Sequence, residues 1–240
     1  MNKVALVTGG TRGIGSAIST KLKNSGYKVI ANYASNDESA KKFSESENID
    51  VMKWDVSNFE DCTKAINEVY EKFSNIDVLV NNAGITRDAP LHKMSLENWE
   101  KVINVNLNSV FNLTSLTINK MRDNGFGRII HISSVNGQKG QFGQTNYAAT
   151  KSALIGFSKS LALESASKGI TSNVICPGYI NTEMVAAIRE DILKGIIDTI
   201  PSKRLGESKE IAEMVDYLVS EKASYVNGAT FSINGGLWMD

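Results

Sequence analysis

The stretch that decides the fold of this chain is Val4-Ala5-Leu6-Val7, followed at once by Thr8-Gly9-Gly10-Thr11-Arg12-Gly13-Ile14-Gly15. The apolar residues predict a buried strand, and a segment of helical period begins near Gly13. Glycines let the backbone turn sharply and let a pyrophosphate approach the helix N-terminus, where free N–H groups attract anions. The spacing is Gly-x-x-x-Gly-x-Gly and not the more familiar Gly-x-Gly-x-x-Gly, and such turns also serve packing alone. Its place on the first strand nevertheless predicts nucleotide binding.

Short apolar runs alternate with helical patterns along the rest of the chain. Strands are expected at Lys3–Thr8, Tyr27–Tyr33, Val51–Trp54, Val78–Val80, Arg128–Ile132, Ile170–Ile175 and Thr230–Ile233, and helices near Gly13, Glu38, Phe59, Leu96, Asn146 and Ser208. This alternation predicts an α/β fold, a doubly wound parallel sheet with helices on both faces. No repeat or linker interrupts it, so we expect a single domain over residues 1–240.

Composition excludes several classes of protein. The 240 residues carry 26 Lys plus Arg and 26 Asp plus Glu, so no global field favours nucleic acid or an acidic membrane as a partner. No apolar stretch approaches the roughly 18 residues that span a bilayer, and the run after Met1-Asn2-Lys3 is too short for a signal peptide. Cys62 and Cys176 have no metal-type spacing, and no His, Cys and carboxylate cluster suggests a metal. A cytoplasmic enzyme is the expectation.

One segment breaks the alternation. After Pro177-Gly178, residues 179–207 carry helical patterns at Glu183–Arg189 and Ile192–Thr199 before the next helix that must lead to a strand. An insert of this length often acts as a lid over a site. A packing subdomain is the alternative interpretation, and the sequence leaves both open.

The end of the second predicted strand bears on the choice of cofactor. An acidic residue there, about 20 residues past the glycines, would bind the ribose of NAD. The chain has Asn32-Tyr33-Ala34-Ser35 at this point, and the first acids are Asp37 and Glu38. Arg12 in the glycine turn can pair with a 2′-phosphate, although a solvent-facing arginine is the simpler interpretation. Together these residues favour NADP.

Candidate reacting groups lie further along the chain. Tyr147 and Lys151 stand at i and i+4 of a helical pattern, so phenol and ammonium share a helix face. An ordinary tyrosine titrates near ~10, and a nearby cation moves that pKa toward the working pH, which suits a general acid or base. Such pairs also occur by chance on solvated helices. Ser133 and Ser134 follow a predicted strand, where a hydroxyl can bond a substrate oxygen or simply form a turn.

A serine hydrolase is disfavoured. It would need a histidine partner and a nucleophile elbow. His92 falls in a predicted loop, His131 falls within a predicted strand, and no Gly-x-Ser-x-Gly is present. Hydride chemistry is what remains.

Taken jointly, four motifs resemble the short-chain dehydrogenase/reductase family over nearly the whole chain. They are Thr8-Gly-x-x-x-Gly13-x-Gly15, Asn81-Asn82-Ala83-Gly84, Ser134 and Tyr147-x-x-x-Lys151, in family order and spacing. The resemblance implies a Rossmann sheet of about seven strands in the order 3-2-1-4-5-6-7, and a homotetramer.

The resemblance also implies roles for individual residues. Tyr147 would donate the proton, and Lys151 would lower its pKa and hold the nicotinamide ribose. Ser134 would orient the substrate carbonyl, and Asn106 would keep a water in a proton relay behind the lysine. The residues implied as cofactor contacts are Gly9, Thr11, Arg12, Gly13, Ile14, Gly15, Asp55, Val56, Asn82, Ala83, Gly84, Tyr147, Lys151, Pro177, Gly178, Ile180 and Thr182.

Substrate choice rests on a narrower resemblance. The runs 133–147, 85–88 and 177–180 are similar to acetoacetyl-CoA reductases of polyhydroxybutyrate synthesis, which implies an acyl-CoA substrate bound near Asp88, Ser134, Gln141, Gln144, Tyr147, Tyr179 and Arg189. The expected reaction is reduction of acetoacetyl-CoA by NADPH to (R)-3-hydroxybutyryl-CoA. The rival is a 3-oxoacyl-[acyl-carrier-protein] reductase, although such relatives tend to have more basic residues than Met121–Phe126 before the Gly127-Arg128 strand. A non-catalytic NADP-binding sensor is the remote alternative.

Overall fold

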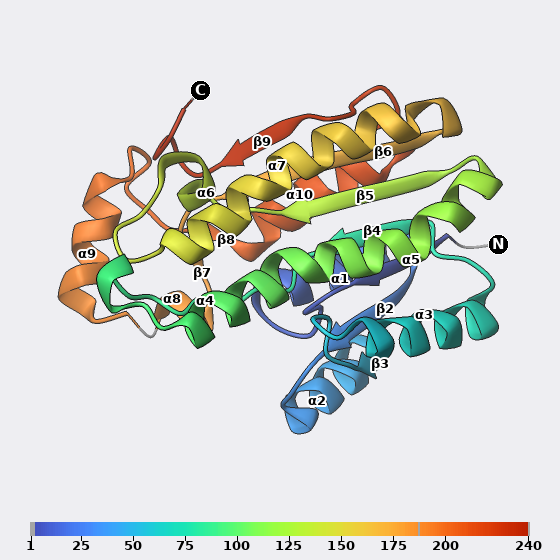
Figure 1. Ribbon diagram of the computed structural model, residues 1–240, viewed down its shortest axis with the longest axis horizontal. Coiled ribbons are helices and arrows are strands. Elements are labelled where there is room, and N and C mark those ends of the chain that lie inside the picture. Colours follow the sequence, from blue (N-terminus) through green and yellow to red (C-terminus); the bar gives the residue numbers. More distant parts are fainter. Residues whose placement is uncertain (1–2, 187, 240) are drawn as a thin grey trace.

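A parallel sheet forms the centre of the computed structural model, which describes residues 3–186 and 188–239 (Figure 1). Residues 1, 2, 187 and 240 therefore lie outside the described part of the expected domain, and residue 187 lies outside that of the 179–207 segment. The seven strands run in the order β3-β2-β1-β4-β5-β6-β9, all paired in parallel. They are β1 (Val4–Val7), β2 (Lys28–Tyr33), β3 (Asp50–Lys53), β4 (Val78–Asn81), β5 (Gly127–Ile132), β6 (Ile170–Pro177) and β9 (Thr230–Ile233). The predicted α/β fold and strand order are confirmed.

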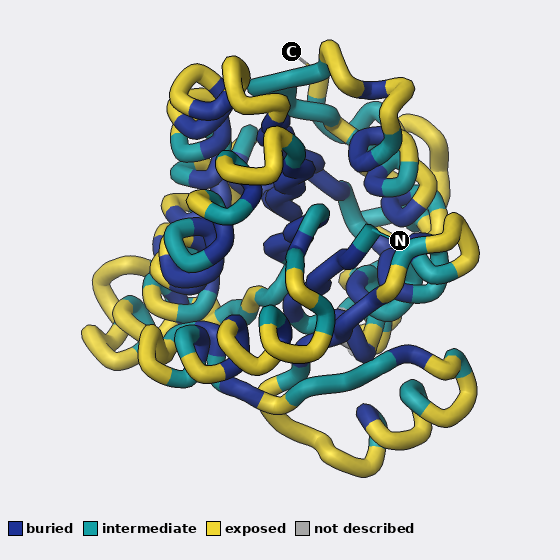
Figure 2. Tube along the Cα trace, turned by 90° about the vertical axis from the view of Figure 1, so that its right-hand side faces the viewer, coloured by how far each residue is buried: buried dark blue, intermediate teal, exposed yellow. Residues whose placement is uncertain are grey.

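Helices cover both faces of this sheet. Alternate strand residues point to opposite sides, so Ala5 and Val7 pack with one group of helices and Leu6 with the other. On the first face lie α1 (Gly13–Asn24), α2 (Asp37–Glu47) and α10 (Ser208–Val219), and on the second lie α3 (Phe59–Phe73), α5 (Ser109–Asn124) and α7 (Thr145–Ser165). Figure 2 shows the strands as a buried centre inside exposed loops and outer helix faces. No helix in the described ranges is long and apolar enough to span a membrane.

The helix expected near Leu96 is interrupted. It runs as α4 (Leu96–Ile103), then widens into a π-helical turn over Asn104–Asn108, and continues as α5. The short helix α6 (Val135–Lys139) was not expected from the sequence. Single turns of 3₁₀ helix occur at Leu91–Lys93, Ala166–Lys168 and Glu221–Ala223. Departures of this kind often mark functional sites.

The 179–207 segment lies at the end of the sheet to which the arrows of β5 and β9 point (Figure 1). It contains β7 (Ile180–Asn181), α8 (Glu183–Ala186), α9 (Glu190–Thr199) and β8 (Gly206–Glu207), and β7 pairs with β8 in a separate two-stranded sheet. The helical pattern predicted at Glu183–Arg189 is described as helix only to Ala186. The expected second helix is present and begins two residues earlier than predicted.

Candidate active site

The glycine turn after β1 has the conformation and the close packing that only glycine allows. Gly9 and Gly13 have positive φ angles of 58° and 52°. A Cβ at Gly15 would lie 2.0 Å from the Gly9 carbonyl oxygen, so the turn must close on itself without side chains. Helix α1 begins at Gly13 with no side-chain cap on its N-terminus. The turn is therefore a bare backbone cradle at a helix N-terminus.

The loop after β4 is fastened to this turn. The Thr8 hydroxyl oxygen accepts hydrogen bonds from the backbone N–H groups of Asn82 and Ala83, each at 2.9 Å. The Asn82 amide donates to the carbonyls of Thr8 at 2.8 Å and Gly9 at 3.2 Å. From β2, the buried Asn32 accepts a hydrogen bond from the Gly9 N–H at 3.2 Å. Sequence reasoning missed this role of Asn32, because a buried amide gives no local signal of its partner.

Other predicted cofactor residues gather at the same edge. Thr182 lies beside the glycine turn, with its Cγ2 3.6 Å from where a Cβ on Gly13 would be. Val56 is buried, and Asp55 accepts hydrogen bonds from Ser57. Burial raises the pKa of the Asp55 carboxyl, but these bonds outweigh it and leave that pKa below its ordinary value. Arg12 is exposed and lies 3.9 Å from Glu183 of α8.

These features fit a nicotinamide dinucleotide. The cradle lacks the side chains that would exclude a pyrophosphate, and its backbone approaches a helix N-terminus. The end of β2 carries the uncharged Asn32 and Tyr33, while Asp37 is engaged by Lys53 at 2.9 Å. Arg12, at the cradle, carries a positive charge that is engaged only in a loose ion pair with Glu183, at 3.9 Å.

The candidate catalytic side chains Tyr147 and Lys151 lie on the first turns of α7. The Lys151 ammonium is 5.6 Å from the centroid of the Tyr147 ring and donates a 2.7 Å hydrogen bond to the Ile132 carbonyl at the end of β5. Lys151 is buried, with 3% of its surface exposed, whereas Tyr147 is partly exposed. The predicted pairing on one helix face is present.

The pKa values differ from the expectation. Burial raises the pKa of Tyr147 to about 12, and a hydrogen bond with Ser134 opposes that rise only in part. The expected lowering of this pKa by Lys151 is therefore not found in the chain alone, because the ammonium points to the Ile132 carbonyl and burial dominates. Burial also lowers the pKa of Lys151 to about 8. At neutral pH the phenol thus holds its proton and the lysine remains largely cationic, but a phenol with so high a pKa is a weaker proton donor than the sequence predicted.

Ser134 is placed by the short helix α6. It is the N-cap of that helix, and its hydroxyl oxygen accepts a 3.1 Å hydrogen bond from the Asn136 N–H. Its hydrogen is then free to be donated. Helix α6 packs directly on α7, since a Cβ on Gly137 would lie 2.8 Å from the Cβ of Lys151. The serine is thereby held next to Tyr147.

Asn106 lies in the π-helical turn and is buried. Its side chain accepts from the Ile85 N–H at 2.8 Å and donates to the Ile85 carbonyl at 3.0 Å and the Thr150 hydroxyl at 3.3 Å. A Cβ on Gly84 would lie 3.4 Å both from Asn106 Oδ1 and from Lys151 Nζ. The asparagine and the lysine therefore flank the same glycine, in the neighbourhood expected of a relay.

Two of the predicted substrate residues are joined in one polar network, and a third lies beside it. Gln144 donates to Asp88 at 2.8 Å and accepts from Asn136 at 3.0 Å. Asn136 also lies near the Tyr179 phenol and opposes the rise that burial causes in the pKa of that phenol. Among the described contacts, Gln141 and Arg189 do not join this network. The exposed Gln141 accepts from Lys139 at 3.0 Å, and the exposed Arg189 pairs with Asp191 at 2.8 Å. Asn136 was not predicted as a site residue.

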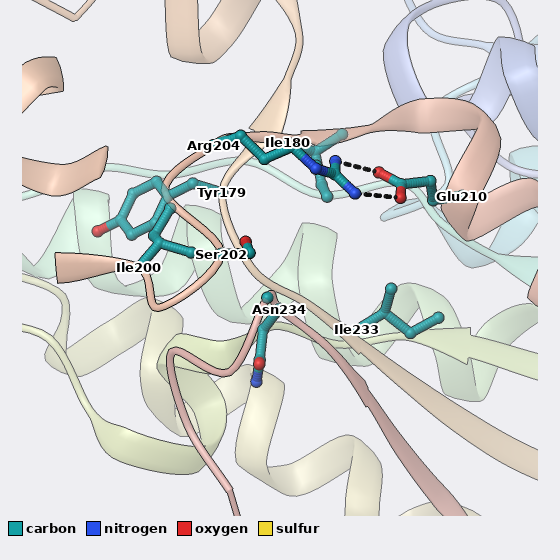
Figure 3. Close-up of a pocket in the computed structure, with 10 residues that line it drawn as sticks. Tyr179, Ile180, Ile200, Ser202, Arg204, Glu210, Ile233 and Asn234 are labelled. Carbon is teal, nitrogen blue, oxygen red and sulfur yellow. Dashed lines mark hydrogen bonds and ion pairs between the residues drawn. The ribbon is translucent and has the colours of Figure 1, made fainter. Parts of the chain in front are cut away.

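Behind Tyr179 the chain encloses a cavity of about 50 Å³, too small for a substrate (Figure 3). Arg204 spans one side of it in a bidentate ion pair with Glu210, at 2.7 and 2.8 Å. Figure 3 shows the Tyr179 ring on the opposite side, with its hydroxyl directed away from that ion pair. The cavity therefore belongs to the packing of the 179–207 segment.

Comparison with known proteins gives consistent matches. A family model described as "Enoyl-(Acyl carrier protein) reductase" matches residues 9–238. The chain is 56% identical over 237 residues to an acetoacetyl-CoA reductase of Shinella zoogloeoides, and 56% identical over 237 residues to one of Rhizobium meliloti, with 98% of each chain covered in both cases. It is 45% identical over 239 residues to a 3-oxoacyl-[acyl-carrier-protein] reductase of Salmonella typhimurium, covering 99% of this chain and 98% of that one.

Proposed function

The chain belongs to the short-chain dehydrogenase/reductase family, and from that premise we propose that it reduces acetoacetyl-CoA to (R)-3-hydroxybutyryl-CoA with NADPH. It is an oxidoreductase that acts on a CH–OH or keto group, and enzymes of this kind use a nicotinamide cofactor. The observation that carries the proposal is the placement of Tyr147 and Lys151 on one face of α7, with the Lys151 ammonium 5.6 Å from the centroid of the Tyr147 ring and the Ser134 hydroxyl beside the phenol. Two relatives that are 56% identical and named acetoacetyl-CoA reductase support the choice of substrate.

The cofactor site would be formed by the glycine turn with Thr11, Arg12 and Ile14, by Asp55 and Val56, by Asn82–Gly84, and by Pro177, Gly178, Ile180 and Thr182. When bound, the cofactor supplies the hydride that reduces a carbonyl carbon. Arg12 favours NADPH over NADH because a guanidinium can pair with the 2′-phosphate.

The reacting residues of the chain act on the carbonyl oxygen. Ser134 donates a hydrogen bond to it with its hydroxyl hydrogen, while the hydroxyl oxygen accepts from the Asn136 N–H. Tyr147 gives its proton to the oxygen as negative charge develops there. The Lys151 cation then stabilises the phenolate that is left, and Asn106 keeps the water through which the proton is replaced. These contributions grow with charge that appears only in the transition state, so they act mainly on kcat.

The assembly and the 179–207 segment complete the proposal. We propose one NADP-binding domain over residues 1–240, with 179–207 as a lid over the acyl-CoA site that includes Gln141 and Arg189. The loose ion pair between Arg12 and Glu183 supports closure of this segment on the cofactor edge.

A cytoplasmic homotetramer is proposed by analogy with the family, and exposed apolar side chains such as Phe111, Leu163 and Tyr225 would suit subunit contacts.

Tyr147→Phe tests the chemical assignment. The variant keeps the ring and loses only the acid, so we expect normal NADPH binding by fluorescence titration and a fall in kcat of at least about a hundredfold. A kcat close to that of the parent chain would refute the role of Tyr147.

A second candidate is reduction of 3-oxoacyl groups carried by acyl carrier protein, which the relative of that name at 45% identity supports. The two functions are separated by kcat/KM for acetoacetyl-CoA against acetoacetyl-acyl carrier protein under the same conditions. We expect the CoA thioester to be preferred. A clear preference for the carrier-protein thioester would establish the second function in place of the first.

A further inference from the structure

The first acidic side chain after the glycine turn is Asp37, which opens helix α2. It follows the glycines at close to the spacing of about 20 residues at which an acid binds the ribose hydroxyls of NAD. A free carboxylate in this place would accept hydrogen bonds from those hydroxyls and would repel a 2′-phosphate. It would therefore favour NADH, in opposition to Arg12.

This acid lies at the same edge of the sheet as the glycine turn. Residues 34–36 separate it from the end of β2, and Lys53, the last residue of β3, is paired in register with Tyr33 at that end. The Gly10 N–H of the turn donates a 2.9 Å hydrogen bond to the Asn32 carbonyl of β2. Helix α2 lies beside β3 (Figure 1). Because open α/β sheets bind their ligands beyond the carboxyl ends of the strands, Asp37 belongs to the adenosine end of the cofactor site.

Asp37 is not a free carboxylate in this structure. The Lys53 ammonium donates a 2.9 Å hydrogen bond to Asp37 Oδ2, and the two side chains are 51% and 66% exposed. This bond lowers the pKa of the Asp37 carboxyl below its ordinary value, so the acid is charged at neutral pH. The ammonium and the carboxylate together carry no net charge, and one oxygen of the acid is already engaged.

The neighbouring acid is paired as well. Glu38 lies 2.7 Å from Lys42, one turn further along α2. Both acids in the first turn of α2 therefore have a lysine partner, but the origin of the two lysines differs. Lys42 belongs to the same helix as its acid, whereas Lys53 is supplied by the edge strand of the sheet.

We propose that Lys53 neutralises Asp37 and thereby determines, together with Arg12, that the chain prefers NADPH to NADH. The inference rests on the cofactor assigned under the proposed function and deepens it. Lys53 is a positioning residue, because it acts through the Asp37 carboxylate and not by contact with the 2′-phosphate. Selectivity then has two sources, which are attraction of the phosphate by Arg12 and removal of its repulsion by Lys53.

The test measures the dissociation constants of NADPH and NADH by fluorescence titration of the chain without substrate, at low ionic strength. Lys53→Met should weaken NADPH binding and strengthen NADH binding, so that the preference for NADPH falls by about fivefold, as one uncompensated carboxylate near a phosphate predicts. The change should diminish at high salt, because exposed charges are screened. Loss of packing around Lys53 would not respond to salt in this way.

A second substitution separates neutralisation from direct contact. When Lys53→Met is combined with Asp37→Asn, no carboxylate remains to be neutralised, so the preference should return to that of the parent chain. If Lys53 itself bound the 2′-phosphate, the double variant would retain the full loss. Lys53→Arg, which keeps the cation, should retain the parent preference.

The matched control is Lys41→Met. It removes the lysine from another exposed ion pair of α2, that with Glu45 at 3.9 Å, and leaves a carboxylate that is further from the start of the helix. This variant should bind both cofactors as the parent does. Thermal unfolding of every variant identifies any that has lost its fold, and Lys53→Gln replaces Lys53→Met in that case.

An unchanged preference in Lys53→Met, or an equal loss in the double variant, would overturn the inference and leave the proposed use of NADPH intact. A parent chain that bound NADH as tightly as NADPH would overturn the proposed cofactor and this inference together. Since no substrate is present in the titrations, failure to reduce acetoacetyl-CoA would count against the proposed reaction alone.

Discussion

His131 provides a quantitative test of how the core responds to pH. It is fully buried in β5, with its ring nitrogens 3.3 Å from the Asn81 amide nitrogen and 3.2 Å from the Ser172 hydroxyl. Burial, with a smaller contribution from the Lys151 cation, lowers its pKa from 6.5 to about 3. The folded chain therefore keeps this imidazole neutral at pH values where the unfolded chain protonates it.

The sign and size of the effect follow from linkage. Between pH 6.5 and about 3 the unfolded state binds one more proton at this residue, so the free energy of unfolding falls as the pH is lowered. Each pH unit within that window contributes about 1.4 kcal/mol. From pH 7 to pH 5, His131 should reduce the free energy of unfolding by about 2 kcal/mol.

The assay is urea unfolding followed by tryptophan fluorescence, at pH 7 and pH 5 and at one protein concentration. His131→Gln keeps a donor and an acceptor but does not titrate, so its loss between the two pH values should be smaller than that of the parent by about 2 kcal/mol. His92→Gln, at an exposed position, is the control and should follow the parent. Carboxylates titrate alike in all three chains and cancel in the comparison. Equal losses in the parent and in His131→Gln would refute the reasoning.

The glycine turn leads to two more predictions. Gly15→Ala should abolish NADPH binding in a fluorescence titration, because the new methyl carbon would lie 2.0 Å from the Gly9 carbonyl oxygen. Gly195→Ala is the control: its methyl group would meet no atom within 4 Å, so binding should remain intact. Retained affinity in Gly15→Ala would contradict the cradle. Arg12→Ala should lower the ratio of kcat/KM with NADPH to that with NADH by about tenfold, since a charge-assisted bond to the 2′-phosphate is lost. An unchanged ratio would remove Arg12 from cofactor selection.

Much of the architecture was predictable from local patterns. The local sequence is sufficient to predict strand β1 and the turn that follows it. A buried parallel strand must be apolar, and a tight turn from strand to helix must lack side chains. The strand order was implied by the family resemblance and is confirmed. The spacing of Tyr147 and Lys151 likewise defined a pair on one helix face before any contact was known.

What the sequence by itself determined about this protein is therefore the alternation of its elements, its glycine cradle and the pairing of Tyr147 with Lys151 on one helix face. The tertiary structure decided the surroundings of Tyr147: segments far apart in the chain desolvate its phenol and raise its pKa to about 12, which no spacing reveals. It also decided the partner of Asn136, whose amide donates to Gln144 at the N-cap of α7. The physical reason is the same in both cases. Desolvation and the direction of a hydrogen bond depend on neighbours in space, and the periodicity of a sequence reports only neighbours along a helix or strand.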